Sequence, residues 1–325
     1  MKTWQLLGAV LGVVLLISIF SVWFVPSLQS FMTSNSQWNG IKNSLKEVNG
    51  KPIPSLDELD VLPEESIIIS VPYLEYTQSE LEKIKNYVMS GGTLMLVDDY
   101  GFGNEVLVYL GTTIRFDGKP LLDPLFCYSN PWLPKITDFT FQMNLLNKPK
   151  LVYLDPGPPE PPVLLSKDSA TKISLVVLNH ATALVNVPDE YILAESSPTS
   201  YIDRDNNGVL SPGEQASPYP VAAKLPLGKG TVILVSDPSI FINGMLNQYD
   251  NLKFIEVILK SDDAKDLFID VSHLPEAPLD NVKSALVRVR DFLGQPYPIL
   301  AVVGITFVSI SWLVLKRGGS IGRQS

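Results

Sequence analysis

The stretch Ser66–Asn104 decides the fold, and it reads SIIISVPYLEYTQSELEKIKNYVMSGGTLMLVDDYGFGN. The continuous apolar run at 66–71 is typical of a strand buried on both faces of a parallel sheet. A capping box and apolar residues at helical spacing predict a helix over 77–89. The glycine pair at 91–92 ends this helix, and 93–97 is the next buried strand. Strand, helix and strand together predict a βαβ unit.

The rest of the middle of the chain repeats this alternation. A short amphipathic helix is expected at 41–48 and a longer one at 251–260, and strands are expected at 173–178, 191–194, 221–225 and 231–236. The pattern predicts an α/β domain over 35–275 with a mostly parallel, flavodoxin-like sheet. Proline-rich residues 121–162 interrupt it as an irregular excursion rather than a separate core.

Both ends of the chain are apolar. Residues 4–25 and 297–315 carry no charge and are each about long enough to cross a bilayer, so they predict an N-terminal and a C-terminal transmembrane helix. A cleavable signal peptide is the alternative for the first run, which is longer than a usual signal core and ends in bulky residues. A buried core helix is the alternative for the second run.

Basic flanks predict the orientation of these spans. Residues 1–3 and the basic tail 316–325 contain no acid, so both termini are expected in the cytoplasm and the central domain outside it, as in a two-pass protein of the cell membrane. Residues 276–295 predict an amphipathic juxtamembrane stalk, which could instead be an interfacial helix or a dimer seam. Expected partners are the lipid bilayer, other membrane or transport subunits, and a second copy through the stalk or the spans.

Charge and cysteine content exclude two classes of protein. Only four of the 25 Lys and Arg residues lie outside 42–290, whereas all 34 acids lie within 47–291, which leaves the middle with a net charge of −13. Such a domain repels phosphate backbones, so no nucleic-acid partner is expected. The single Cys127 has no partner within the chain, which excludes a disulfide scaffold.

One motif is specific enough to name a ligand. Residues Asp203–Glu214 read DRDNNGVLSPGE and match the calcium loop D-x-[DN]-x-[DN]-G-x₅-E at every defined position. Ca²⁺ takes six to eight hard oxygen ligands, and alternate residues of such a loop point toward one centre. The expected ligands of one Ca²⁺ are the side chains of Asp203, Asp205 and Asn207, the carbonyl of Val209, Ser211 directly or through water, and Glu214 as the bidentate closing ligand.

Two simpler readings of this loop stay open. Asp, Asn and Gly also favour an ordinary turn, and Ser211 with Glu214 forms a capping box for a following helix. Leu210 occupies the apolar place that normally packs inward. Prolines at 198 and 218 leave no room for helices of normal length on either side, which argues against a paired EF-hand sensor.

Two longer stretches carry a family resemblance. Residues 66–111 and 219–251, the latter reading YPVAAKLPLGKGTVILVSDPSIFINGMLNQYDN, resemble the membrane-anchored DUF4350 family, whose members look like class I glutamine amidotransferase-type α/β domains. The resemblance covers roughly 35–260, and its most specific parts are the glycine turns at 91–92 and 228–230 and the run at 236–245. It implies a membrane-proximal domain that works with transport or assembly partners.

The chain departs from amidotransferases in its chemistry. Those enzymes place a nucleophilic cysteine on a tight turn after a buried strand, beside an activating histidine. Here the turns after the three best strands read VPYLEY, DDYGFG and DPSIF, without cysteine. Cys127 lies in the proline-rich stretch, and no recognisable motif surrounds His180 or His273. The sequence therefore predicts a domain that is not an amidotransferase.

Three functions follow as hypotheses. The first is a calcium-stabilised, non-catalytic domain that binds a partner or ligand. The second is a hydrolase that uses side chains at the carboxyl ends of strands, where open α/β sheets bind ligands, although the same residues also suit loop and helix caps. The candidates for it are Asp98, Asp99, Asn104, Asp237, Ser239 and Asn243. The third is a structural subunit of a membrane assembly.

Overall fold

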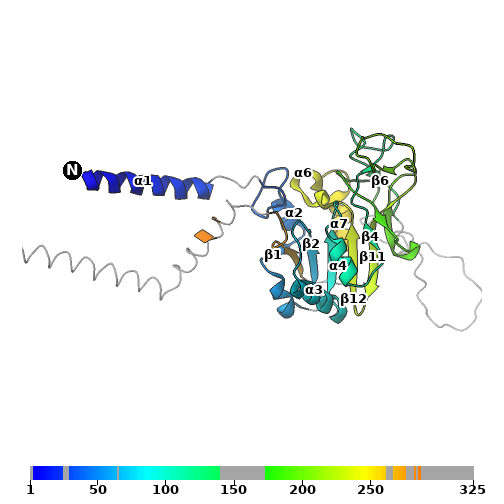
Figure 1. The fold of residues 1–325 in the computed structure, drawn as a ribbon, viewed down its shortest axis with the longest axis horizontal. Coiled ribbons are helices and arrows are strands. Elements are labelled where there is room, and N and C mark those ends of the chain that lie inside the picture. Colours follow the sequence, from blue (N-terminus) through cyan, green and yellow to red (C-terminus); the bar gives the residue numbers. More distant parts are fainter. Residues whose placement is uncertain are drawn as a thin grey trace, which may run out of the picture. The chain divides into compact units, whose positions relative to one another are not determined.

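The computed structural model describes residues 3–24, 29–63, 66–139, 173–260 and 266–275, with 282, 285 and 286. The chain divides into two compact units, and everything from Leu28 to Glu276 belongs to one of them. This unit contains the predicted α/β domain (Figure 1).

A seven-stranded sheet forms the centre of the domain. Its spatial order is β1 (Gly50–Ile53), β13 (Leu267–Asp270), β2 (Ile67–Ser70), β3 (Thr93–Val97), β12 (Gly230–Val235), β11 (Pro220–Leu227) and β9 (Ile192–Glu195). The pairs from β1 to β12 are parallel, whereas β11 pairs antiparallel with both β12 and β9. The prediction of a mostly parallel α/β sheet is confirmed.

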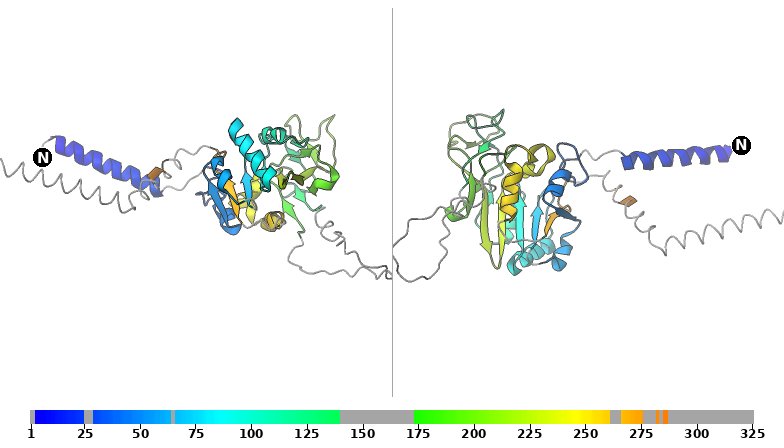
Figure 2. Two further views of the ribbon diagram at one scale, coloured as in Figure 1. Left: turned by 90° about the horizontal axis from the view of Figure 1, so that it is seen from below. Right: turned by 180° about the vertical axis from the view of Figure 1, so that it is seen from behind.

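Helices cover both faces of this sheet (Figure 2). One face carries α3 (Gln78–Ser90), α4 (Asn104–Tyr109) and the 3₁₀ helix η1 (Leu56–Val61). The other carries α2 (Lys42–Glu47), η3 (Pro238–Phe241), α6 (Asn243–Leu246) and α7 (Asn251–Lys260). Alternate residues of β3 enter the two cores: Leu94 and Leu96 face the α3 layer, and Met95 faces the α7 layer.

Helix α3 begins and ends as the sequence predicts. The Thr77 hydroxyl accepts a hydrogen bond from the Glu80 amide, and the Glu80 carboxylate accepts one from the Thr77 amide at 2.7 Å, so the capping box is complete. Gly91 follows the last turn with φ +135°, a conformation that favours glycine. The chain then enters β3, parallel to β2, which confirms the βαβ unit.

Three two-stranded ribbons extend the domain beyond the sheet. They pair β5 (Leu121–Leu122) with β10 (Tyr201–Ile202), β4 (Arg115–Phe116) with β8 (Leu184–Val185), and β6 (Lys135–Ile136) with β7 (Val176–Val177). The first part of the predicted excursion is therefore anchored to the domain. Its remainder, 140–162, lies outside the described residues. The strand predicted over 173–178 is reduced to two residues.

The predicted membrane spans require a correction. Helix α1 (Thr3–Phe24) occupies the range of the first one. Within the part of the chain that the structure describes, no helix is long and apolar enough to cross a membrane.

This finding contradicts the prediction of flanking transmembrane helices. It equally contradicts a two-pass location in the cell membrane with cytoplasmic termini and an extracytoplasmic domain. The second predicted span, 297–315, the tail 316–325 and nearly all of the stalk 276–295 lie outside the described residues.

The start of β12 packs against the end of α3 so closely that only glycine fits. A β-carbon added to Gly230 would overlap the backbone oxygens of Gly92 and Val88, which are held in the helix terminus. We therefore expect Gly230→Ala to lower the free energy of unfolding by about 1–3 kcal/mol, as overpacking does. Urea denaturation measures this loss.

Gly12→Ala is the matched control for this prediction. A β-carbon at Gly12 in α1 meets nothing within 4 Å, and alanine favours a helix over glycine, so this variant should be no less stable than the wild type. If Gly230→Ala were as stable as Gly12→Ala, the close approach of β12 to α3 would be contradicted.

Candidate metal centre

The predicted calcium loop leaves the domain directly after β10. Asp203, at its start, is fully buried, and its amide donates a hydrogen bond to the carbonyl of Pro120 at 2.9 Å. The Asp203 carboxylate turns back over the loop and accepts hydrogen bonds from the amides of Asn207 at 3.1 Å and Gly208 at 2.8 Å. The start of the loop is thus held rigidly on the ribbon that β5 and β10 form.

Three carboxylates of the loop converge. One oxygen each from Asp203, Asp205 and Glu214 lies within 4.8 Å of the others. Arg204, between the first two, does not neutralise them, because its guanidinium pairs with Asp117 at 3.1 Å. Among the described residues, no Lys or Arg forms an ion pair with any of the three carboxylates. This cluster could hold a metal ion.

Glu214 closes the loop through its backbone contacts. One carboxylate oxygen accepts from the Arg204 amide at 2.7 Å and the other from the Ser211 amide at 2.9 Å. One oxygen of Glu214 therefore faces the beginning of the loop and the other faces its end. Glu214 thus links the beginning of the loop to its end.

The remaining side chains predicted as ligands join the same cluster. The Asn207 amide group donates to Asp205 at 2.9 Å and to the Ser211 hydroxyl at 2.7 Å, and that hydroxyl donates to Asp205 at 3.0 Å. The amide of Val209 donates to Asn207 at 2.8 Å. The loop therefore brings together the side chains of all five predicted side-chain ligands.

The end of the loop differs from two expectations. Leu210 is 51% exposed and does not pack inward. No helix follows Ser211; Pro212 and Glu214 instead form an isolated bridge around Gly213, whose φ is +98°. The predicted cap over Ser211–Glu214 thus closes a turn, because the glycine adopts a left-handed conformation that a helix does not allow.

The carboxylates at the carboxyl edge of the sheet serve mainly as caps. Asp98, after β3, accepts from the amides of Tyr100, Gly101 and Gly103. Asp237, after β12, is fully buried and accepts from the amides of Asn179 and Ser239, both at 2.7 Å. The capping interpretation of these two residues is confirmed.

The polar hydrolase candidates around them are also structural. The Asn104 side chain exchanges two hydrogen bonds with the backbone of Phe116. The Asn243 side chain donates to the carbonyls of Asn35 and Gln37 and accepts from the amide of Asn43. Ser239 lies at the first turn of η3, which Asp237 caps.

Asp99 is the exception at this edge, because no other described residue donates a hydrogen bond to its carboxylate. Burial, together with the charges of Asp237 and Asp98, raises the pKa of Asp99 to about 8. Burial also raises the pKa of Asp237 to about 7, against its two amide donors. The space beside Asp99 is lined by Tyr73, Tyr100 and Pro238. This space is too small to admit a water molecule.

The sequence did not reveal the buried pair that Asp270, at the end of β13, forms with His273. His273 is 3% exposed, its Nδ1 lies 2.7 Å from Asp270, and its ring stacks on Tyr76 at 4.0 Å. Burial opposes ionisation of Asp270, but His273 and Ser272 outweigh it and hold the pKa of Asp270 below its usual value. Strand β13 was not predicted either; its short apolar run ending in aspartate was the available signal.

Cys127 and the other histidine lie apart from any catalytic pattern. The backbone of Cys127 forms an isolated antiparallel β-bridge with that of Pro134. The ring of His180 packs against the ring of Trp132, with 4.7 Å between the ring centroids. Within the described part of the chain, no hydrogen bond joins Cys127 to a histidine.

The pKa values of Asp99 and Asp237 predict how stability depends on pH. Between about pH 4, where aspartates ionise in the unfolded chain, and about pH 8, the folded state retains protons that the unfolded state releases. Stability should therefore fall as the pH rises through this window. At pH 8.5 we expect Asp99→Asn to be more stable than the wild type by at least ~1 kcal/mol, and at pH 5 by much less.

Thermal unfolding at both pH values tests this expectation. Glu82→Gln, which changes an exposed carboxylate on α3, is the control and should follow the wild type at both. A gain at pH 8.5 no larger for Asp99→Asn than for Glu82→Gln would show that Asp99 is ionised without cost.

Comparisons with known proteins give a family and a set of distant folds. Residues 33–259 match the family described as Domain of unknown function (DUF4350). No curated protein matches the chain. The solved structures that are similar include the mmIFT52 N-terminal domain, at 14% identity and a TM-score of 0.47, over 75% of this chain and 97% of that one.

Two β-galactosidases are also similar. The enzyme from Bacillus circulans sp. alkalophilus has 12% identity and a TM-score of 0.30, over 58% of this chain and 23% of that one. The enzyme from Rahnella sp. R3 has 10% identity and a TM-score of 0.33, over 62% and 23%. The match spans about a quarter of the length of these enzymes. All three TM-scores lie under 0.5 and carry no conclusion about function.

Proposed function

The chain belongs to the DUF4350 family, and we propose that its domain binds one Ca²⁺ in the loop Asp203–Glu214 and acts as a non-catalytic domain that binds a partner or ligand. The observation that carries the calcium site is the convergence of Asp203, Asp205 and Glu214 within 4.8 Å, in a loop that matches the calcium motif. Three carboxylates this close repel each other, and a divalent cation relieves that repulsion.

The donor set favours Ca²⁺ over Mg²⁺. The cluster contains only oxygen ligands on a short loop, and Asn207 and Ser211 add neutral oxygens to the three carboxylates. Ca²⁺ accepts six to eight such ligands in flexible geometry, whereas Mg²⁺ requires a near-ideal octahedron and retains its waters. An exposed loop with one buried carboxylate meets the first requirement better than the second.

Calcium would stabilise this part of the domain by clamping the loop to the ribbon. Asp203 is fixed to Pro120, and Arg204 to Asp117, so both anchors lie near the chain between β4 and β5. An ion that joins Asp203 to Glu214 closes a loop of twelve residues on these anchors. The ordering then extends from the ribbon toward the start of β11.

The non-catalytic part of the proposal rests on how the strand ends are used. The carboxylate oxygens of Asp98 and Asp237 accept hydrogen bonds from backbone amides. Among the described residues, no hydrogen bond activates Cys127. An amidotransferase-like domain without its nucleophile is consistent with the mostly parallel sheet between two helical layers. Such a domain retains the fold as a platform for binding.

A carboxylate-based hydrolase is the second candidate. The raised pKa of Asp99 favours it, because a general acid is poised near neutral pH. The space beside Asp99 is closed to water, however, so a substrate has no room there. Binding is therefore the function that the site supports better.

Calorimetric titration of the full chain with CaCl₂ tests the calcium site. We expect one site with a dissociation constant on the order of 10⁻⁴–10⁻³ M, and weaker binding of Mg²⁺. Saturation at about 100 times the dissociation constant should raise the free energy of unfolding by ~2.7 kcal/mol. Glu214→Gln removes the charge of the closing ligand and should weaken binding at least about tenfold; adding Asp203→Asn should abolish it.

Asp189→Asn is the matched control. Asp189 is an exposed carboxylate outside the loop, and its variant should bind Ca²⁺ like the wild type. Absence of heat and of a thermal shift at about 10 mM Ca²⁺ would contradict the proposal. So would unchanged binding by the Glu214→Gln variant.

A further inference from the structure

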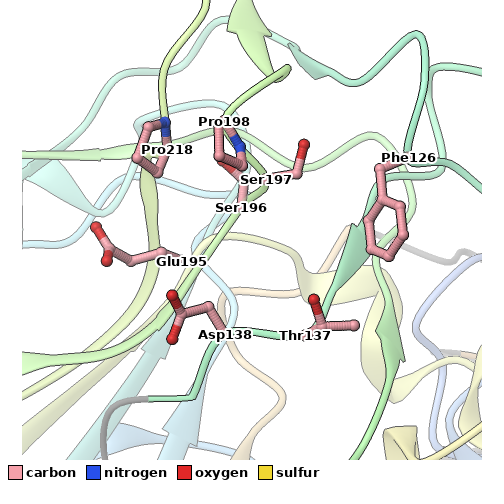
Figure 3. Close-up of a pocket in the computed structure, with 8 residues that line it drawn as sticks. All are labelled: Phe126, Thr137, Asp138, Glu195, Ser196, Ser197, Pro198 and Pro218. Atoms are coloured by element: carbon pink, nitrogen blue, oxygen red, sulfur yellow. The ribbon is translucent and has the colours of Figure 1, made fainter.

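A cavity of about 380 Å³ (Figure 3) lies beside the end of β9, at the same edge of the sheet as the carboxyl ends of the parallel strands. Its volume falls in the range of small-molecule sites. The side chains that shape it are acidic, hydroxylic or apolar: Phe126, Thr137, Asp138, Glu195, Ser197 and Pro198.

Two carboxylates form one wall of the cavity. Asp138 and Glu195 are partners in an antiparallel bridge, and the Glu195 amide donates to the Asp138 carbonyl at 3.1 Å. Figure 3 shows their side chains next to each other, with the ring of Phe126 across the cavity. The main chain therefore forces two like charges together.

No protein cation neutralises this pair. Within the described residues, neither Asp138 nor Glu195 forms an ion pair, and Lys135 instead lies over the Phe126 ring at 6.0 Å. Burial, then the charges of Asp138 and Asp189, raises the pKa of Glu195. A positive group in the cavity would remove this unfavourable interaction.

Hydrogen bonds order the part of the cavity wall that Phe126, Ser196 and Ser197 form. Asp123 is fully buried, and its carboxylate accepts hydrogen bonds from the Phe126 amide at 2.8 Å and from the Ser197 hydroxyl. The buried Ser196 hydroxyl accepts from the Tyr219 amide at 2.9 Å, which fixes the chain next to Glu195. These contacts order the cavity before any ligand arrives, which lowers the entropy that binding costs.

We infer that this cavity binds a small organic cation, an ammonium or guanidinium group on a short apolar stem, with Asp138 and Glu195 as its counter-charges. The Phe126 ring and Pro198 offer the apolar surface for the stem, and cations also favour aromatic faces. Anions are repelled by the same two carboxylates. This inference rests on the proposed binding function and names its ligand class.

The experiment uses the full chain with three probes that share one butyl stem. Butylamine carries an ammonium group, butylguanidine a guanidinium group, and 1-butanol neither. Binding is followed by NMR titration, in saturating Ca²⁺ and again in EDTA. We expect both cations to bind and 1-butanol to bind at least about tenfold more weakly, because charge-assisted hydrogen bonds provide the affinity.

Isosteric variants assign the binding to the cavity. Glu195→Gln and Asp138→Asn should each weaken binding of the better cation at least about tenfold. Asp189→Asn removes a nearby exposed charge that does not line the cavity, and should change binding less than about twofold. The circular dichroism of each variant checks its fold, and Thr137→Val tests the cavity wall without a change of charge.

Three results would overturn the inference. They are no binding of either cation by folded protein, equal binding of 1-butanol, or a loss in Asp189→Asn as large as in Glu195→Gln. The calcium titration of the same samples is read separately. Cation binding in EDTA without any calcium site would leave this inference standing while the calcium proposal fails, and the reverse result would do the opposite.

Discussion

Burial of β3 and β12 on both faces of the sheet is the constraint on which the rest of the structure depends. The two strands pair in parallel from Thr231 opposite Thr93 to Val235 opposite Val97, and their side chains enter both cores. A strand that is apolar on both faces is stable only where helices cover both faces of the sheet and keep its side chains from water. The same pairing brings Asp98, Asp99 and Asp237 to one edge, because they directly follow these two strands.

The antiparallel half of the domain has a different physical character. Beyond β12 the sheet continues through β11 and β9, and short ribbons replace helices. Here hydrogen bonds to buried carboxylates connect the segments. Asp123 accepts them from residues within 125–126 and 197–200, and Asp203 accepts one from within its own loop. Both the candidate calcium loop and the acidic cavity lie in this half. Both candidate sites thus use residues outside the parallel strands, whereas Asp98 and Asp237, after β3 and β12, accept hydrogen bonds from backbone amides.

Sequence patterns predicted the elements whose signals are local. The capping box of α3, the glycine turn after it and the apolar runs of β2, β3 and β12 each depend on residues close in the chain. The calcium loop was found for the same reason, since its ligands lie within twelve consecutive residues. Strands β1 and β13 were missed because each spans only four residues. The pairs Asp270–His273 and Asp138–Glu195 depend on how the chain folds. The membrane prediction relied on the length and lack of charge of two apolar runs and on their basic flanks.

The central claim is that Asp203, Asp205 and Glu214 hold one calcium ion. A crystal structure grown in CaCl₂, with an anomalous difference map, measures this directly. We expect a single anomalous peak within about 2.3–2.6 Å of oxygens from these three residues, with Asn207 and Ser211 as further ligands. A map with no peak between the three carboxylates, at a Ca²⁺ concentration that saturates such sites, would contradict it.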